Sequence, residues 1–132
     1  MIRTLIVEDS TFYRQLLKEA LNSRFPRMDI FEATDGEEAL EKIEAHLPDL
    51  VFMDIKLPGE SGLDFTKKIK TQNPNIVVII LTAYDIPEYR EAAKQYKADY
   101  FLSKGSATKE DILTLVDSIL LDRCVDHIDS KS

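Results

Sequence analysis

Five short apolar runs alternate along the chain with longer amphipathic runs, and this alternation constrains the fold more than any other feature of the sequence. The apolar runs are Thr4–Val7, Met28–Ala33, Leu50–Met53, Ile76–Leu81 and Tyr100–Leu102. Each run has the length of a strand, and the segment after it carries apolar residues at helical spacing. Strands that are each followed by a helix predict an α/β fold, in which a doubly wound parallel sheet has helices on both faces.

Polar and turn residues mark where the helices begin. Ser10 is placed to cap the first helix, Pro87 to open a helix over residues 88–96, and Thr108 to cap the last helix. Beyond residue 122 the chain is polar. We therefore expect one domain over residues 1–122, followed by a tail or the start of a linker over residues 123–132.

Composition narrows the class of protein. A chain of 132 residues suits one domain, and its net charge of −7 argues against binding of DNA or RNA by this domain alone. The single cysteine, Cys124, cannot form an internal disulfide, and with His127 it offers too few ligands for a metal site. The N-terminal residues do not resemble a signal peptide, and no apolar run approaches the roughly 18 residues of a membrane span. We expect a cytoplasmic domain without membrane contact.

Polar side chains follow the predicted strands at the points where the strands end. They are Glu8, Asp9, Asp54, Thr82 and Lys104. Because the carboxyl ends of parallel strands meet at one edge of a sheet, where such folds bind their ligands, we expect these residues to converge.

This set of residues suggests phosphoryl transfer. Two carboxylates 4 Å apart repel by roughly 4 kcal/mol at an effective dielectric of about 20, and Mg²⁺ is suited to offset that repulsion. Asp54 would be the nucleophile, Lys104 would stabilise charge on the phosphoryl oxygens, and Thr82 would hydrogen-bond one of them.

The same residues resemble those of the response regulator receiver family, which acts in bacterial-type two-component signalling. Similar stretches are Leu5–Ser10, Asp35–Leu40 and Pro48–Ile55, and the resemblance extends over about residues 2–121. It implies a flavodoxin-like, three-layer α/β/α fold with strand order 2-1-3-4-5. It also implies a phosphorylation-controlled signalling module, rather than an enzyme, that receives a phosphoryl group from a histidine kinase or phosphotransfer protein.

The resemblance assigns a role to each matching position. Asp54 is the expected phosphoacceptor, and Lys104 the expected phosphoryl-binding lysine. Thr82 and Tyr100 are the expected switch pair. The expected Mg²⁺ ligands are Glu8 (through a water), Asp9, Asp54 and the backbone carbonyl of Lys56. The fourth helix, fifth strand and fifth helix form the expected surface for an output partner, an attached output domain or a second copy of the chain.

Some positions depart from the family pattern, and other functions stay open. Lys56 occupies a variable position that influences phosphoryl lifetime, where a cation can either pair with the phosphoryl group or hinder water. Lys97 stands where glycine is frequent, and Gly105 where proline is frequent. The alternative is a Mg²⁺-dependent phosphatase or phosphotransferase, but we find neither a second acid beside Asp54 nor a cap insertion. A flavodoxin-like cofactor binder would need a glycine-rich first loop, and Glu8–Thr11 lacks glycine.

Overall fold

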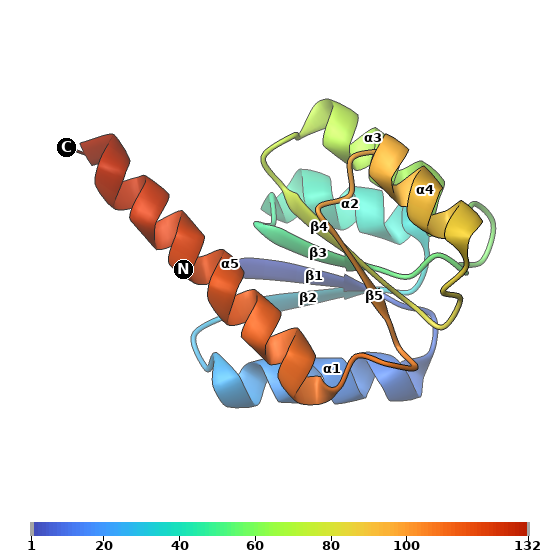
Figure 1. The fold of residues 1–132 in the computed structure, drawn as a ribbon, viewed down its shortest axis with the longest axis horizontal. Coiled ribbons are helices and arrows are strands. Elements are labelled where there is room, and N and C mark those ends of the chain that lie inside the picture. Colours follow the sequence, from blue (N-terminus) through green and yellow to red (C-terminus); the bar gives the residue numbers. More distant parts are fainter. Residues whose placement is uncertain (1, 132) are drawn as a thin grey trace.

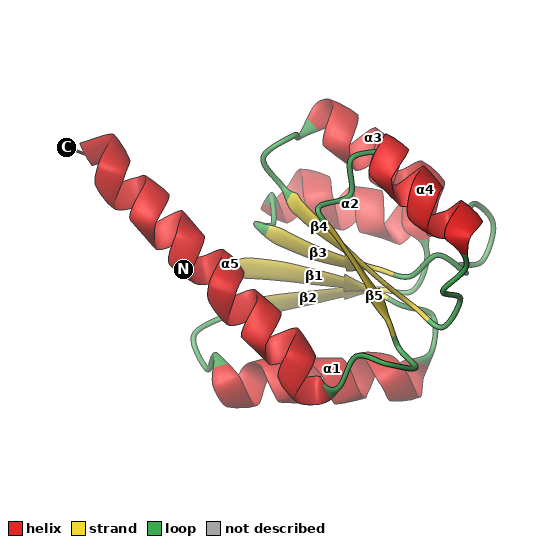
Figure 2. Cartoon of the chain, viewed as in Figure 1, coloured by secondary structure: helices red, strands yellow, loops and turns green. Residues whose placement is uncertain are grey.

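The computed structural model describes the backbone of residues 2–131 and the side chains of residues 2–122. Within these residues, five strands alternate with five helices (Figures 1 and 2). In chain order they are β1 (Arg3–Val7), α1 (Thr11–Arg24), β2 (Asp29–Ala33), α2 (Gly36–His46), β3 (Leu50–Met53), α3 (Gly62–Gln72), β4 (Val77–Thr82), α4 (Pro87–Gln95), β5 (Tyr100–Ser103) and α5 (Lys109–Lys131). All neighbouring strands pair in parallel, in the order β2-β1-β3-β4-β5. The predicted fold and strand order are confirmed.

The sheet is the middle of three layers. Helices α1 and α5 cover one face, and α2, α3 and α4 cover the other (Figure 1). Successive residues of a strand point to opposite faces. Ile6, Phe52 and Ile79 therefore pack toward α1 and α5, whereas Val7 and Ile80 pack toward the other helices.

The central strands β3 and β4 explain the continuous apolar runs in the sequence. Every residue from Leu50 to Met53, and from Val78 to Ile80, is at most 1% exposed. A strand covered on both faces has no solvent side on which polar residues could alternate. Burial of each large side chain stabilises the fold by about 1.5–3 kcal/mol. The carboxyl ends of these strands are therefore held in fixed positions.

The helix starts follow the sequence signals. The hydroxyl of Ser10 accepts a hydrogen bond from the backbone N–H of Tyr13 at 3.3 Å, and Pro87 is the first residue of α4. Thr108 and Asp111 exchange two hydrogen bonds at the start of α5, each from a backbone N–H to the partner's side chain, of 2.9 and 3.0 Å. The three predicted helix starts are confirmed.

The C-terminal ends of α4 and α5 bear on two of the sequence-based expectations. Lys97 follows α4 with a φ of 68°, a left-handed conformation that explains why glycine suits this position. Helix α5 continues to Lys131, beyond the end of its apolar stripe, and the domain boundary at residue 122 stays a prediction. No helix among the described residues is long and apolar enough to cross a membrane.

Candidate functional site

The predicted site residues are held by the last backbone hydrogen bonds of the sheet. The N–H of Glu8 donates to the carbonyl of Ala33 at 3.0 Å, and the N–H of Asp54 donates to that of Val7 at 3.1 Å. At the other side of the sheet, the N–H of Lys104 donates to the carbonyl of Thr82 at 2.8 Å. These backbone bonds continue the parallel ladders past β1, β3 and β5, so the sheet itself fixes where each side chain starts.

Lys104 joins the acids of two different strands. Its ammonium forms ion pairs with Glu8 Oε1 and, at 3.2 Å, with Asp54 Oδ2. The lysine side chain is 15% exposed, so this contact is largely shielded from water. Burial opposes the charged form of Lys104, but the hydrogen bond to Glu8 and the charges of both acids outweigh burial and raise the lysine pKa. The side chain is thus held as a cation beside Asp54.

Glu8 is the most deeply buried acid of the site, at 3% exposure. Its Oε2 accepts a hydrogen bond of 2.9 Å from the N–H of Ser10. Burial raises the pKa of Glu8, and the nearby charge of Asp54 adds to this effect, while Lys104 and the Ser10 N–H act against it. Keeping this carboxylate ionised therefore depends on Lys104 and on the N–H of Ser10.

Three carboxylates come together, as the sequence predicted. One oxygen from each of Glu8, Asp9 and Asp54 lies within 4.8 Å of the others. Asp9 is exposed, whereas Asp54 is buried, and Asp54 Oδ1 has no hydrogen-bond partner among the described residues. A buried carboxylate oxygen without a partner is costly, and Lys104 neutralises only part of the negative charge. Both observations fit a hard divalent cation such as Mg²⁺.

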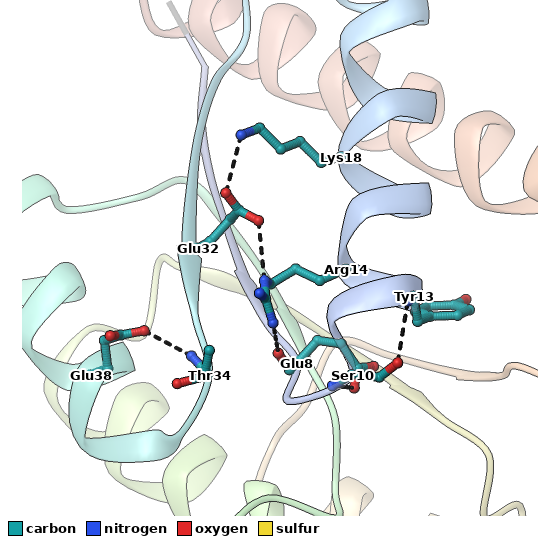
Figure 3. A network of polar contacts seen from close by, with 8 residues as sticks. All are labelled: Glu8, Ser10, Tyr13, Arg14, Lys18, Glu32, Thr34 and Glu38. Carbon is teal, nitrogen blue, oxygen red and sulfur yellow. Dashed lines mark hydrogen bonds and ion pairs between the residues drawn. The ribbon is translucent and has the colours of Figure 1, made fainter.

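A basic network on α1 supports the first strand end (Figure 3). Arg14 Nη1 donates to the backbone carbonyl of Glu8 at 2.8 Å, and Arg14 Nε pairs with Glu32 at 3.1 Å. Lys18 pairs with the other oxygen of Glu32 at 3.1 Å. Burial alone would raise the pKa of Glu32, but the two cations outweigh burial and lower it. Glu32 therefore anchors Arg14, and Arg14 anchors the backbone of Glu8.

Gly62 closes the loop that follows Asp54, and the sequence analysis missed its role. Its N–H donates to the carbonyl of Ile55 at 2.9 Å, at the first turn of α3. A Cβ built on Gly62 would stand 1.8 Å from the backbone oxygen of Asp54. Only a residue without a side chain permits this approach. In the sequence, Gly62 is indistinguishable from an ordinary turn glycine.

The two residues of the predicted switch pair, Thr82 and Tyr100, lie on opposite faces of the sheet. Residues in register on β4 and β5 are Ile79 with Tyr100, Ile80 with Phe101, and Thr82 with Ser103. Tyr100 is 38% exposed and lies on the α5 side of the sheet, near Ile119.

Phe101 instead points to the other face, and by the period of two so does Thr82. The aromatic residue that shares a sheet face with Thr82 is therefore Phe101, because Phe101 is in register with Ile80, two residues before Thr82 on β4. The hydroxyl of the buried Thr82 accepts a hydrogen bond of 3.2 Å from the N–H of Tyr84.

Lys56 is exposed, and its ammonium lies over two aromatic rings, one in the loop after β4 and one in α4. Its Nζ lies 5.2 Å from the ring centroid of Tyr84 and 5.6 Å from that of Tyr89. The predicted role of its carbonyl as a metal ligand stays a prediction. Cys124 and His127 lie outside the residues whose side chains the structure describes.

Comparison with known families now decides the identity of the fold and site. The family model described as "Response regulator receiver domain" matches residues 4–122. This chain belongs to that receiver domain family. It is accordingly a receiver domain of two-component signalling, and its acidic pocket of Glu8, Asp9 and Asp54 is typical of the receiver Mg²⁺ site and consistent with a phosphoacceptor site.

Solved structures and curated relatives agree. The receiver domain protein (CheY-like) from Methanospirillum hungatei superposes with a TM-score of 0.87 at 27% identity, covering 96% of this chain and 98% of that one. A response regulatory protein of Staphylococcus epidermidis is 37% identical over 126 residues, which cover 93% of this chain and 49% of the relative. Sporulation initiation phosphotransferase F of Bacillus subtilis is 34% identical over 116 residues, covering 71% of this chain and 92% of the relative.

Many relatives of the receiver domain are longer proteins. A protein-glutamate methylesterase/protein-glutamine glutaminase of Paramagnetospirillum magneticum is 39% identical over 98 residues, which are 28% of its length. Against that relative and the Staphylococcus protein, the receiver domain spans half of the length or less. Receiver domains are typically non-catalytic signalling modules, and some are fused to enzymatic domains.

Proposed function

We propose that this receiver domain accepts a phosphoryl group on Asp54 from a histidine kinase or a phosphotransfer protein, and that it signals through the resulting change in shape. The observation that carries the proposal is the environment of the Asp54 carboxylate. One of its oxygens lies 3.2 Å from the ammonium of Lys104, and the other is buried without a partner among the described residues. A carboxylate with a cation at one oxygen and a free second oxygen is prepared for attack on phosphorus.

The reaction moves one phosphoryl group. A carboxylate oxygen of Asp54 bonds to phosphorus, the bond between phosphorus and the donor's imidazole nitrogen breaks, and that nitrogen keeps the electron pair and takes a proton from solvent. Lys104 lies within reach to pair with a phosphoryl oxygen, since its ammonium already contacts Asp54. Glu8 holds Lys104 from the other strand end, so the lysine does not need to be ordered during the reaction.

We propose that Mg²⁺ would be held by Asp9, Asp54 and the backbone carbonyl of Lys56, with Glu8 acting through a water; the clustering of the three carboxylates supports this set. When bound, Mg²⁺ would offset the negative charge that accumulates on the carboxylates and the phosphoryl oxygens.

Phosphorylation of Asp54 would add about −1.5 to −2 charges next to Lys104. The Thr82 hydroxyl, bonded in this structure to the N–H of Tyr84, would turn to donate to a phosphoryl oxygen. Phe101, on the same sheet face, would follow into the space that Thr82 leaves. We propose that this movement alters the surface of α4, β5 and α5, which then binds an output partner, an attached output domain or a second copy of the chain.

The test is stoichiometric labelling. With a small phosphodonor and Mg²⁺, the wild-type protein should gain one phosphoryl group, and Asp54→Asn should gain none because the amide is a poor nucleophile. Asp64→Asn, an exposed acid in the first turn of α3, is the matched control and should label like the wild type. Removing Mg²⁺ with a chelator should slow labelling strongly.

Labelling of Asp54→Asn at the wild-type rate would refute the proposal. Release of phosphate from a monoester beyond one equivalent would indicate a phosphatase instead.

A further inference from the structure

The ammonium of Lys104 meets an aromatic ring as well as the two acids. Its Nζ lies 4.3 Å from the ring centroid of Tyr13, the shortest of the cation–ring distances among the described residues. An ammonium over an aromatic face is attracted by the negative charge of that face, and more strongly where water is excluded. We propose that Tyr13 is a positioning residue for Lys104, whose ring holds the ammonium where a phosphoryl group on Asp54 would meet it. The inference rests on the proposed function of Asp54 and Lys104.

Tyr13 is itself fixed by the first turn of α1. Its backbone N–H donates to the capping hydroxyl of Ser10, and the N–H of Ser10 donates to the carboxylate of Glu8 (Figure 3). The next residue, Arg14, holds the backbone carbonyl of Glu8 at 2.8 Å. The first turn of α1 thus binds Glu8 at two points and presents a ring to the lysine that pairs with Glu8.

The phenol of Tyr13 stays neutral under ordinary conditions. The ring is half-buried, and burial raises the pKa of its hydroxyl above the usual value of 10. The contact with Lys104 therefore depends on the ring face and not on a phenolate charge. A phenylalanine at the same position would preserve it.

Tyr13 adds a third contact to the two ion pairs of Lys104, whose stem is flexible. The four-carbon chain of lysine has many rotamers, and order in it is entropically costly. Tyr13 and Lys104 both line a cavity of about 450 Å³ between α1 and α5, together with Leu16 and Ile112.

The experiment compares Tyr13→Leu with Tyr13→Phe. Both keep an apolar side chain on α1, and only the phenylalanine keeps a ring. The readouts are the affinity for beryllofluoride, as an analogue of the phosphoryl group, and the rate of labelling by a small phosphodonor. In Tyr13→Leu both should fall about tenfold, as expected for loss of a partly buried cation–π contact, and Tyr13→Phe should stay within about twofold of the wild type. Phe12→Leu, on an exposed neighbour that has no cation–ring contact among the described residues, is the control for loss of a ring from α1.

A double-mutant cycle separates positioning from a structural role. In a Lys104→Met background, Tyr13→Leu should have no further effect on labelling, because the group that it positions is gone. A full and additive effect there would overturn the inference, and so would wild-type labelling by a folded Tyr13→Leu protein.

A measurement without phosphate distinguishes this failure from failure of the proposed function. In the wild-type protein, the ring current of Tyr13 should shift the ε-methylene protons of Lys104 upfield, and Tyr13→Leu should abolish the shift. If that shift is present but no variant binds beryllofluoride, the positioning is correct and the phosphoacceptor assignment fails. Unshifted ε-methylene protons in the wild type would overturn the role of Tyr13, whatever the labelling shows.

Discussion

Replacement of Gly62 by alanine should damage both the stability of the domain and the phosphoacceptor site. The added Cβ would stand 1.8 Å from the carbonyl oxygen of Asp54, 2.8 Å from its carbonyl carbon and 3.0 Å from Met53 Cγ. Cβ contacts under 3.0 Å essentially do not occur, so α3 and the end of β3 must separate by more than an ångström. Two of the three clashing atoms are backbone, which cannot turn aside as a flexible side chain can.

The cost can be worked out from this geometry. Overpacking of a tight contact costs about 1–3 kcal/mol, and the backbone clash places Gly62→Ala in the upper part of that range. Alanine regains up to about 1 kcal/mol because glycine loses more chain entropy on folding. The net loss is about 2 kcal/mol, or roughly 8 °C in melting temperature for a domain of this size. Labelling of Asp54 should slow as well, because the displaced backbone carries the nucleophile.

The assay is thermal or urea unfolding combined with phosphodonor labelling. Gly105→Ala is the matched control, since its Cβ would meet only Ser103 Oγ at 3.6 Å, an ordinary contact. Gly105→Ala should be neutral or slightly stabilising. If Gly62→Ala melted at or above the wild-type temperature and labelled normally, the claim that this glycine sets the position of Asp54 would be wrong.

Two further predictions concern stability. Glu32→Gln should destabilise the domain at neutral pH, and the difference in unfolding free energy from wild type should shrink as pH falls below about 4.5. A carboxylate whose pKa is lowered by folding contributes stability above its unfolded pKa, and this stability is lost as pH falls through the folded pKa. Urea unfolding across pH measures the difference, and a difference independent of pH would contradict the prediction. Thr108→Ala should lower the unfolding free energy by about 1 kcal/mol, because it removes the cap of α5. Thr114→Ala, at an exposed position within the same helix, should be neutral or slightly stabilising. Equal unfolding free energies for the two variants would count against the capping role of Thr108.

The sequence was sufficient for the architecture because burial on both faces leaves a simple pattern. Residues 50–53 and 76–81 are apolar without interruption, as expected for parallel strands that are covered on both faces. Once the sheet is parallel, the positions that follow the strands must share an edge. The convergence of Glu8, Asp54 and Lys104 therefore followed from topology before any distance was known.

The remaining features depend on packing between segments that are distant in sequence. Gly62 matters because α3 approaches the end of β3 closely, and nothing in the local sequence states that distance. The contact of Tyr13 with Lys104 depends on how α1 sits against the sheet. Whether Tyr100 or Phe101 shares a sheet face with Thr82 depends on the register between β4 and β5, which the structure supplies.

The contact between Glu8 and Lys104 joins residues that are 96 positions apart. On a ribosome, the three acids of the pocket are made before their lysine, which follows Asp54 by 50 positions. Until β5 has emerged and docked, the nascent chain holds Glu8, Asp9 and Asp54 without that cation, and their mutual repulsion works against the pairing of β1 with β3. A nascent chain that ends before residue 104 would hold this acid cluster without its counterion, so the pocket is completed only after β5 has been made.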